Sequence, residues 1–130
     1  EIADKHRASF EDVHDLRAKV QAVVALTEKN AQSVRDTNVK YHALLTSIAS
    51  RFGASVETRG TSQMNVPFEW RDAFNSQYRS VQYDIRFEQA AVLWNIAAAT
   101  SYLGLMTRRD DAEGIKRACH LYQQAAGAVA

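Results

Sequence analysis

The chain has 130 residues, about the length of one ordinary domain, and a globular composition with 46% hydrophobic and 24% charged residues. Sixteen Lys and Arg residues stand against fifteen Asp and Glu residues, so the net charge of +1 offers no basic excess for nucleic acid or an anionic membrane. The single cysteine, Cys119, cannot form a disulfide within the chain, which excludes a disulfide-stapled secreted module and favours a reducing compartment. One proline and five glycines predict long uninterrupted helices.

Two long amphipathic helices are predicted in the first half of the chain. Ser9 is a preferred N-cap residue, and apolar residues recur at spacings of three and four after it, which predicts a helix over residues 10–26. The polar residues 27–30 predict a break. A second helix is predicted over residues 31–52, with an inward face of Val34, Tyr41, Leu44, Leu45, Ile48 and Phe52.

The middle of the chain is its least regular segment. Residues 53–66 are polar and show no period, which predicts a long loop. Pro67 disfavours helical geometry in the residue before it, so a short extended or β element is expected near residues 64–70. One helical turn is predicted at residues 70–74.

A third long helix is predicted over residues 81–106. Within and just beyond it, residues 89–107 carry no charge and are long enough to cross a bilayer. Five alanines and polar residues such as Asn95 and Thr100 favour a buried helix in a helical array over a membrane span.

The last helix is predicted to begin with a capping box, with Asp110 as the N-cap and Glu113 three residues later. It continues through Ile115, Ala118, Cys119, Tyr122 and Ala125, and it reaches residue 130 without a C-terminal cap. The last four carbonyl groups of a helix need partners. We therefore expect residues 1–130 to form part of a larger helical domain that continues beyond residue 130.

No set of residues predicts catalysis, and no cofactor or metal site is expected. The glycine-rich motifs that bind phosphate are absent, and the four histidines lack metal-ligand spacing. Cys119 is interpreted as a small buried core residue in preference to a nucleophile, and His120 as a surface or interface polar group.

Glu88 and the two tryptophans stand out in their apolar surroundings. Glu88 lies between Phe87 and an apolar run, so an ion pair or a contact with the backbone around Trp70 is favoured over a catalytic role. Trp70 and Trp94 are predicted to be buried, and an exposed Trp94 would argue against a helical array.

Four sequence blocks follow one another from Pro67 onward. They are a W-x-D-A-F box at residues 70–74, an F-E-x-A-x-V-L-x-N-I-A helix at 87–97, an E-G-x-K helix start at 113–116 and a Q-x-A-A-G-A segment at 123–128. In this order and spacing they resemble the Bro-type (BRO1) domain family, whose members include ALIX, the histidine-domain protein tyrosine phosphatase, PalA and rhophilin. Residues 1–52 match the family only by helix pattern.

The resemblance implies a mainly α fold, an array of long helices with tetratricopeptide-like packing and a small sheet, forming the N-terminal portion of a banana-shaped domain. It implies a non-catalytic protein–protein interaction domain of an ALIX-like endosomal sorting adaptor, cytoplasmic and recruited to endosomes. The implied partner is the amphipathic C-terminal helix of ESCRT-III subunits, the charged multivesicular body protein family. No nucleic-acid partner is expected, and membrane association is expected only through partners.

The resemblance also places a partner contact at the start of the last helix, where the family has an acidic residue four positions before a lysine. Lys116 matches the lysine, whereas Ala112 occupies the acidic position, with Asp111 before it and Glu113 after it. Lys116, Asp111, Ala112 and His120 are therefore the candidate partner-binding residues, and Ile115 is expected to be buried and structural.

Two other functions are compatible with the same domain. One is a signalling scaffold of the pH-response or Rho-effector type, and the other is the targeting domain of a phosphatase-like protein. Neighbouring coiled-coil, PDZ, proline-rich or phosphatase segments would distinguish them.

Overall fold

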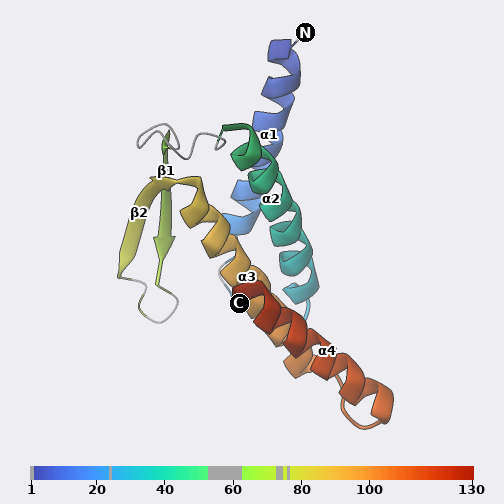
Figure 1. Ribbon diagram of the computed structural model, residues 1–130. Helices are drawn as coiled ribbons and strands as arrows, with labels where there is room; N and C mark the ends of the chain where they lie inside the picture. Colours follow the sequence, from blue (N-terminus) through green and yellow to red (C-terminus); the bar gives the residue numbers. More distant parts are fainter. Residues whose placement is uncertain (1, 24, 53–62, 73–74, 76) are drawn as a thin grey trace.

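Four helices and one β-hairpin make up the part of the chain that the computed structural model describes, which is residues 2–23, 25–52, 63–72, 75 and 77–130, without the side chains of residues 2–10, 51–52, 63–67 and 82–83. In chain order the elements are α1 (Ile2–Gln21), α2 (Ala31–Phe52), β1 (Gln63–Arg71), β2 (Arg79–Asp84), α3 (Ile85–Met106) and α4 (Ala112–Val129) (Figure 1). The mainly helical fold and the β element near residues 64–70 are confirmed.

Helix α3 is the centre of this arrangement. It packs against α2 and α4 and also contacts both strands of the hairpin, while α1 packs against α2. The hairpin and α4 therefore lie toward opposite ends of α3 (Figure 1). In the described part of the chain no helix is both long and apolar enough to cross a membrane.

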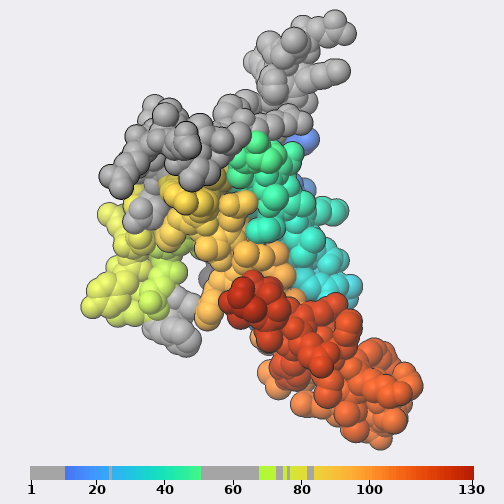
Figure 2. Space-filling view, viewed as in Figure 1, coloured from blue at the N-terminus to red at the C-terminus, as the bar shows by residue number. Residues whose placement is uncertain are grey.

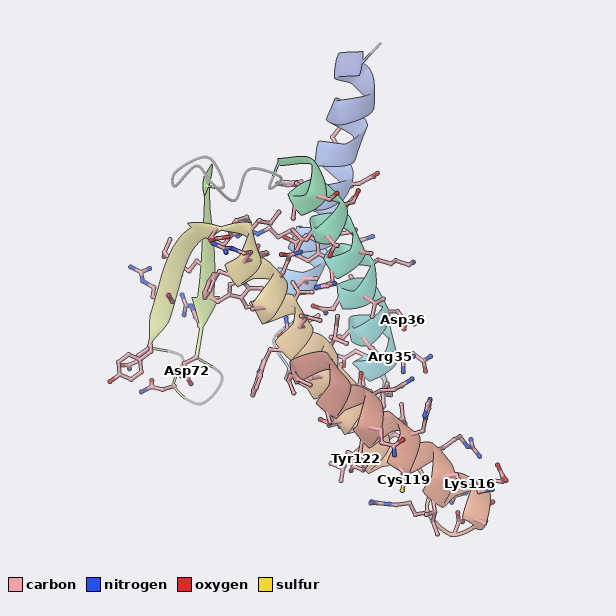
Figure 3. All side chains as sticks on the ribbon, viewed as in Figure 1. Arg35, Asp36, Asp72, Lys116, Cys119 and Tyr122 are labelled. Carbon is pink, nitrogen blue, oxygen red and sulfur yellow. The ribbon has the colours of Figure 1, made fainter. Side chains whose placement is uncertain are left out.

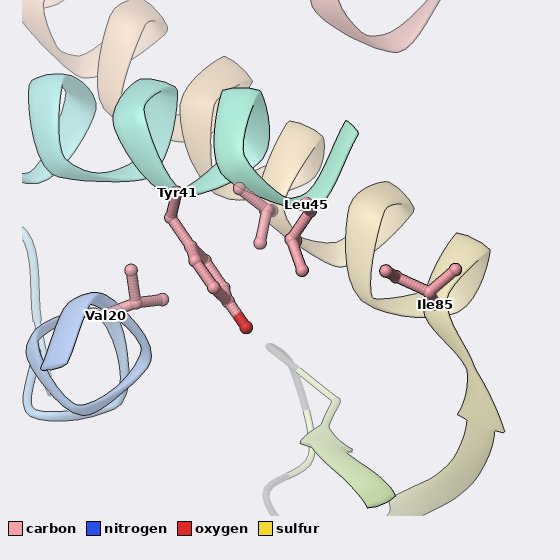
Figure 4. Packing of buried hydrophobic residues seen from close by; sticks show 5 residues of the cluster. Val20, Tyr41, Leu45 and Ile85 are labelled. Atoms are coloured by element: carbon pink, nitrogen blue, oxygen red, sulfur yellow. The ribbon is translucent and has the colours of Figure 1, made fainter. Parts of the chain in front are cut away.

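The hydrophobic core lies where α1, α2 and the first half of α3 meet. It is formed by buried side chains from all three helices, namely Val20, Tyr41, Leu45, Ile85 and Val92 (Figure 4). Burial of one such apolar side chain contributes about 1.5–3 kcal/mol. The inward face predicted for α2 is confirmed at Val34, Tyr41 and Leu45, which are buried, whereas Leu44 and Ile48 are half-buried. The side chain of Phe52, also predicted to face inward, lies outside the described residues.

Helix α1 differs from the prediction at both ends, because it begins at Ile2 and ends at Gln21. Ser9 is therefore an internal residue and no N-cap: the residues before it are compatible with a helix, and one cap-type residue does not stop it. At the other end, the side chain of Asn30 accepts a hydrogen bond from the Thr27 backbone N–H at 2.7 Å and donates one to the Ala25 carbonyl at 2.9 Å. These bonds form the predicted break and extend it back into residues predicted to be helical.

The hairpin replaces two predicted features. Strands β1 and β2 are antiparallel, with Phe68 opposite Gln82 and Arg71 opposite Arg79, so Trp70 and Arg71 are extended and the helical turn predicted at residues 70–74 is wrong there. The turn that follows is built by Asp72, whose carboxylate accepts from the Asn75 N–H at 3.0 Å. The loop predicted over residues 53–66 is also shorter, because residues 63–66 belong to β1, and residues 53–62 lie outside the described part of the chain.

Helix α3 begins four residues later than predicted, because residues 81–84 belong to β2. Asp84 is its N-cap: the carboxylate accepts from the Arg86 N–H at 2.9 Å and also binds the Arg86 guanidinium at 2.7 Å. The Arg86 side chain holds the pKa of Asp84 below its usual value. The alternation of polar and apolar residues in Arg79–Asp84 was the sequence signal for a strand.

Candidate partner-binding site

The N-cap of α4 is Asp111 and not Asp110. Its backbone is extended, and its carboxylate accepts from the Gly114 N–H at 2.6 Å, which satisfies one of the unpaired N–H groups at the helix start. The predicted capping box was therefore displaced by one residue, because two adjacent aspartates can each serve as a cap and the sequence pattern does not choose between them. Glu113 lies in the first turn, where the helix dipole favours an anion.

Glycines allow α3 and α4 to approach each other closely. Gly114 is buried, and a Cβ atom at this position would overlap the carbonyl oxygen of Arg108 in the loop before α4. Further along, the ring of Tyr122 lies over Gly104 of α3, where a Cβ atom would be 3.2 Å from the Tyr122 Cζ atom. The glycine in the E-G-x-K block is thus a packing requirement of the loop that joins α3 to α4.

The buried positions of α4 are occupied by small residues. Gly114, Ala118 and Ala125 are buried, whereas Ile115 is 50% exposed and Val129 is 53% exposed. The predictions of a buried Ile115 and a buried Cys119 are therefore wrong, because the close approach of the two helices places small residues inside and leaves the larger ones outside.

We call the exposed apolar row along α4 the outer stripe; it consists of Ile115, Cys119, Tyr122 and Val129. These residues follow one another at spacings of four, three and seven, so they lie along one side of the helix. Figure 3 shows Cys119 and Tyr122 of this stripe on α4, with Lys116 nearer the helix start. Tyr122 forms the edge of the stripe nearest α3, where its ring packs on Gly104, and it remains 40% exposed.

The candidate partner-binding residues lie together at the start of α4. Ala112, Lys116 and His120 follow one another at intervals of one helical turn, and all three are exposed. The Lys116 Nζ atom is 3.9 Å from a Glu113 carboxylate oxygen, a weak surface contact, and His120 lies beside Gln124, 3.2 Å from Nε2 to Nε2. Asp111 differs from them, because its carboxylate is engaged in capping the helix.

A buried polar cluster lies at the other end of α3, around Glu88, which is 1% exposed. One carboxylate oxygen accepts from the Tyr41 hydroxyl at 2.7 Å, and the other accepts from the Trp70 indole N–H at 2.6 Å. The Arg17 Nε atom is 3.4 Å from Glu88 Oε1, and its guanidinium lies over the Phe68 ring, 5.1 Å from the centroid. We call Arg17, Tyr41, Trp70 and Glu88 the polar cluster.

The polar cluster joins α1, α2, β1 and α3 and is structural in character. Burial and the bond to Glu88 raise the pKa of Tyr41 well above its ordinary value. The predicted ion pair of Glu88 is confirmed, and its contact with Trp70 is made by the indole side chain and not by the backbone. Both carboxylate oxygens accept hydrogen bonds from protein groups, as expected of a buried structural carboxylate.

Trp94 is 55% exposed, so the prediction of a buried side chain at this position is wrong, and Trp70 is half-buried. The helical array nevertheless forms, because α2, α4 and the hairpin cover other sides of α3, and Trp94 lines a pocket between α2, the hairpin and α3. Among the residues that the structure describes, no group of three or more His, Cys, Asp or Glu side chains is placed to hold a metal ion.

Comparison with known proteins identifies the family. The family model described as "BRO1-like domain" matches residues 1–130. The chain is 32% identical over 125 residues to "ALG-2 interacting protein X" of Dictyostelium discoideum and 32% identical over 121 residues to "Vacuolar-sorting protein BRO1" of Arabidopsis thaliana. These matches cover 96% and 93% of the chain, and in each case the chain spans 14% of the relative's length.

A shorter match links the chain to a protein named for an enzyme. "Tyrosine-protein phosphatase non-receptor type 23" of Homo sapiens is 44% identical over 66 residues, which cover 50% of the chain and 4% of that protein. The names of these relatives thus refer to protein interaction, vacuolar sorting and a phosphatase. Because the family model spans all 130 residues, the chain belongs to the BRO1-like domain family.

Proposed function

We propose that the chain is a non-catalytic protein–protein interaction module of an endosomal sorting adaptor, which binds the amphipathic C-terminal helix of ESCRT-III subunits. The protein would be cytoplasmic and would reach endosomes through its partners. The family supports the sorting role, since one relative that matches 93% of the chain is named for vacuolar sorting. The observation that carries the proposal is the outer stripe of α4, with Lys116 beside it.

An amphipathic helix binds through one apolar face, and it needs a complementary apolar surface with charges at the edge. Ile115 is 50% exposed and Tyr122 is 40% exposed on the same side of α4, which supports a contact with such a face. Lys116 would pair with an acidic or C-terminal carboxylate group at the edge of the partner helix. His120 and Ala112 would flank this contact on the same row.

The affinity of this site can be measured with a fluorescein-labelled peptide of an ESCRT-III C-terminal helix. Titration with the chain should give saturable anisotropy, and Lys116→Glu should weaken binding by about tenfold, because an attractive pair becomes a repulsive one. Arg117→Glu is the matched control. It makes the same charge change on the same exposed helix, but Arg117 lies about 100° around the axis from Lys116.

A gain of affinity provides the sharper test. Ala112→Asp introduces the acidic residue that the family pattern has four positions before the lysine, and it should tighten binding of the peptide if this row forms the contact. Equal weakening by Lys116→Glu and Arg117→Glu, with no effect of Ala112→Asp, would show that only net charge matters and would reject the site.

A second candidate is the targeting domain of a phosphatase-like protein or a scaffold in a pH response. It is favoured by the 44% identity to the phosphatase-named relative, and by 36% identity over 94 residues to "pH-response regulator protein palA/RIM20" of Emericella nidulans. In that case the ESCRT-III peptide would not bind, and the same α4 variants would act on a different client.

A further inference from the structure

A second candidate surface lies on the other part of the molecule, between the hairpin and α3. A pocket of about 490 Å³ is lined by Val20 of α1 and residues 23, 25 and 26 just after it, by α2, by Trp70 and Arg71 of β1, and by α3. Figure 2 shows the surface hollowed between the hairpin and α3, the elements that contribute residues 70–71 and 87–98. The volume is within the range of ligand pockets, and most lining side chains are apolar.

Two asparagine side chains form the polar part of this pocket. Asn38 is 1% exposed, and its amide nitrogen donates to the Val34 carbonyl at 2.7 Å. The Val34 carbonyl can only accept a hydrogen bond, so the NH2 group of Asn38 faces Val34 and its side-chain oxygen faces Asn95. The amide nitrogen of Asn95 donates to this oxygen at 3.4 Å. This contact turns the amide nitrogen of Asn95 toward Asn38 and its oxygen away from it.

This orientation leaves part of the Asn95 amide available. Its oxygen and its second N–H have no hydrogen-bond partner among the described residues, and the side chain is only half-buried. One acceptor and one donor, side by side in a fixed plane, match the N–H and C=O groups of a peptide backbone. A helical ligand could not use them, because its backbone groups already bond to one another.

The edge of the pocket carries one aromatic ring and one charge. Trp94 is 55% exposed, and an exposed tryptophan beside an apolar pocket is typical of binding hot spots. Arg71 is the only charged residue among those that line the pocket, and it makes no ion pair with another described residue. Its cross-strand neighbour Arg79 is paired with Glu69 at 3.7 Å, so the local charge at the edge is positive.

We propose that this pocket binds an extended segment of a partner protein that carries a large apolar side chain next to an acidic residue. The apolar side chain fills the space between Trp94 and the end of α1. A backbone peptide group of the segment pairs with the Asn95 amide, and the carboxylate lies at Arg71. The surface is separate from Lys116 and from the outer stripe of α4, so the two partners need not compete.

Selection from a phage-displayed library of random 12-residue peptides on the whole chain tests this proposal. Enriched peptides should carry a large apolar residue next to Asp or Glu, and a synthetic consensus peptide should shift the fluorescence of Trp94. We expect Trp94→Ala to weaken binding of the consensus peptide by about thirtyfold and Asn95→Leu to weaken it by about fivefold. Arg71→Glu should weaken it, while Arg109→Glu, the same charge change in the α3–α4 loop, should not.

Three results would overturn the proposal. One is a selection without any enriched peptide, and another is an enriched peptide whose affinity is unchanged in Trp94→Ala and Asn95→Leu. The third is an enriched sequence with helical spacing of apolar residues that loses binding in Lys116→Glu, which would assign the selected peptides to α4. Unchanged thermal melts of Trp94→Ala and Arg71→Glu, both altered at exposed positions, would exclude unfolding as the cause of lost binding.

Discussion

The two ends of α3 are fastened to the rest of the molecule in opposite ways. At the first end, Glu88 gathers the polar groups of Arg17, Tyr41 and Trp70 in a buried position. At the second end, small residues let α4 approach closely, and the large apolar side chains remain outside. Buried polar residues are therefore structural in this chain, and its exposed apolar residues are the candidates for function.

The largest expected effect is the loss of Glu88. Glu88→Leu keeps a similar volume but removes the acceptor of two hydrogen bonds and the partner of the Arg17 guanidinium. Breaking a buried charge pair from one side costs about 3–5 kcal/mol. The free energy of unfolding from urea denaturation should fall by this amount.

Glu113→Leu is the matched control for this change. The Glu113 side chain is 74% exposed, and its one ion-pair contact, to Lys116 Nζ at 3.9 Å, is weak. Its replacement should therefore change the free energy of unfolding by less than about 0.5 kcal/mol. Similar losses in both variants would contradict the distinction between the two ends of α3.

Tyr41→Phe isolates one bond of the polar cluster. The hydroxyl donates to a charged group at 2.7 Å, so its removal should cost about 1.5–3 kcal/mol in urea denaturation. The pKa of Tyr41 is raised in the folded chain, so the unfolded chain loses this proton first as the pH rises. The stability difference between wild type and variant should be constant below about pH 10 and should narrow above it. A difference that stays constant up to pH 12 would contradict the buried hydroxyl.

A glycine pair tests the second end of α3. Gly114→Ala places a methyl group against the Arg108 carbonyl, and such overpacking should cost about 1–3 kcal/mol. Gly127 lies in the same helix in open space, so Gly127→Ala should stabilise the chain by up to about 1 kcal/mol through helix propensity alone. Thermal melts followed by circular dichroism would separate the two, and a stabilising Gly114→Ala would disprove the close approach.

The sequence was sufficient to predict the long helices and the family, but not every boundary between neighbouring elements. Helical periodicity gave the bounds of α2 correctly, and the four blocks from Pro67 onward indicated the family that the comparison confirmed. The start of α3 was predicted four residues too early, because a strand of six residues leads directly into the helix and Asp84, its N-cap, lay inside the predicted range 81–106.

The exposure of individual residues could not be predicted from periodicity alone. On α4, Gly114, Ala118 and Ala125 are buried and Ile115 is exposed, a result of tertiary packing that no spacing rule contains. The same holds for Asn38 and Asn95, which are 57 positions apart and become a pair only when α2 packs on α3. Arg17 gave no signal in sequence, because its partner Glu88 lies on another helix.

Two isoleucines test the comparison directly, one in the core at the start of α3 and one on the outer stripe of α4. Ile85 is 7% exposed and belongs to the core, so Ile85→Ser should cost about 3–5 kcal/mol in urea denaturation. Ile115 is 50% exposed on the outer stripe, and Ile115→Ser should cost less than about 1 kcal/mol, because its side chain gives up little burial. If the outer stripe binds a partner helix, Ile115→Ser should weaken binding of the ESCRT-III peptide while leaving the thermal unfolding of the chain almost unchanged. Equal destabilisation by the two serines would mean that Ile115 is a core residue in solution, and α4 would then offer no apolar surface to a partner.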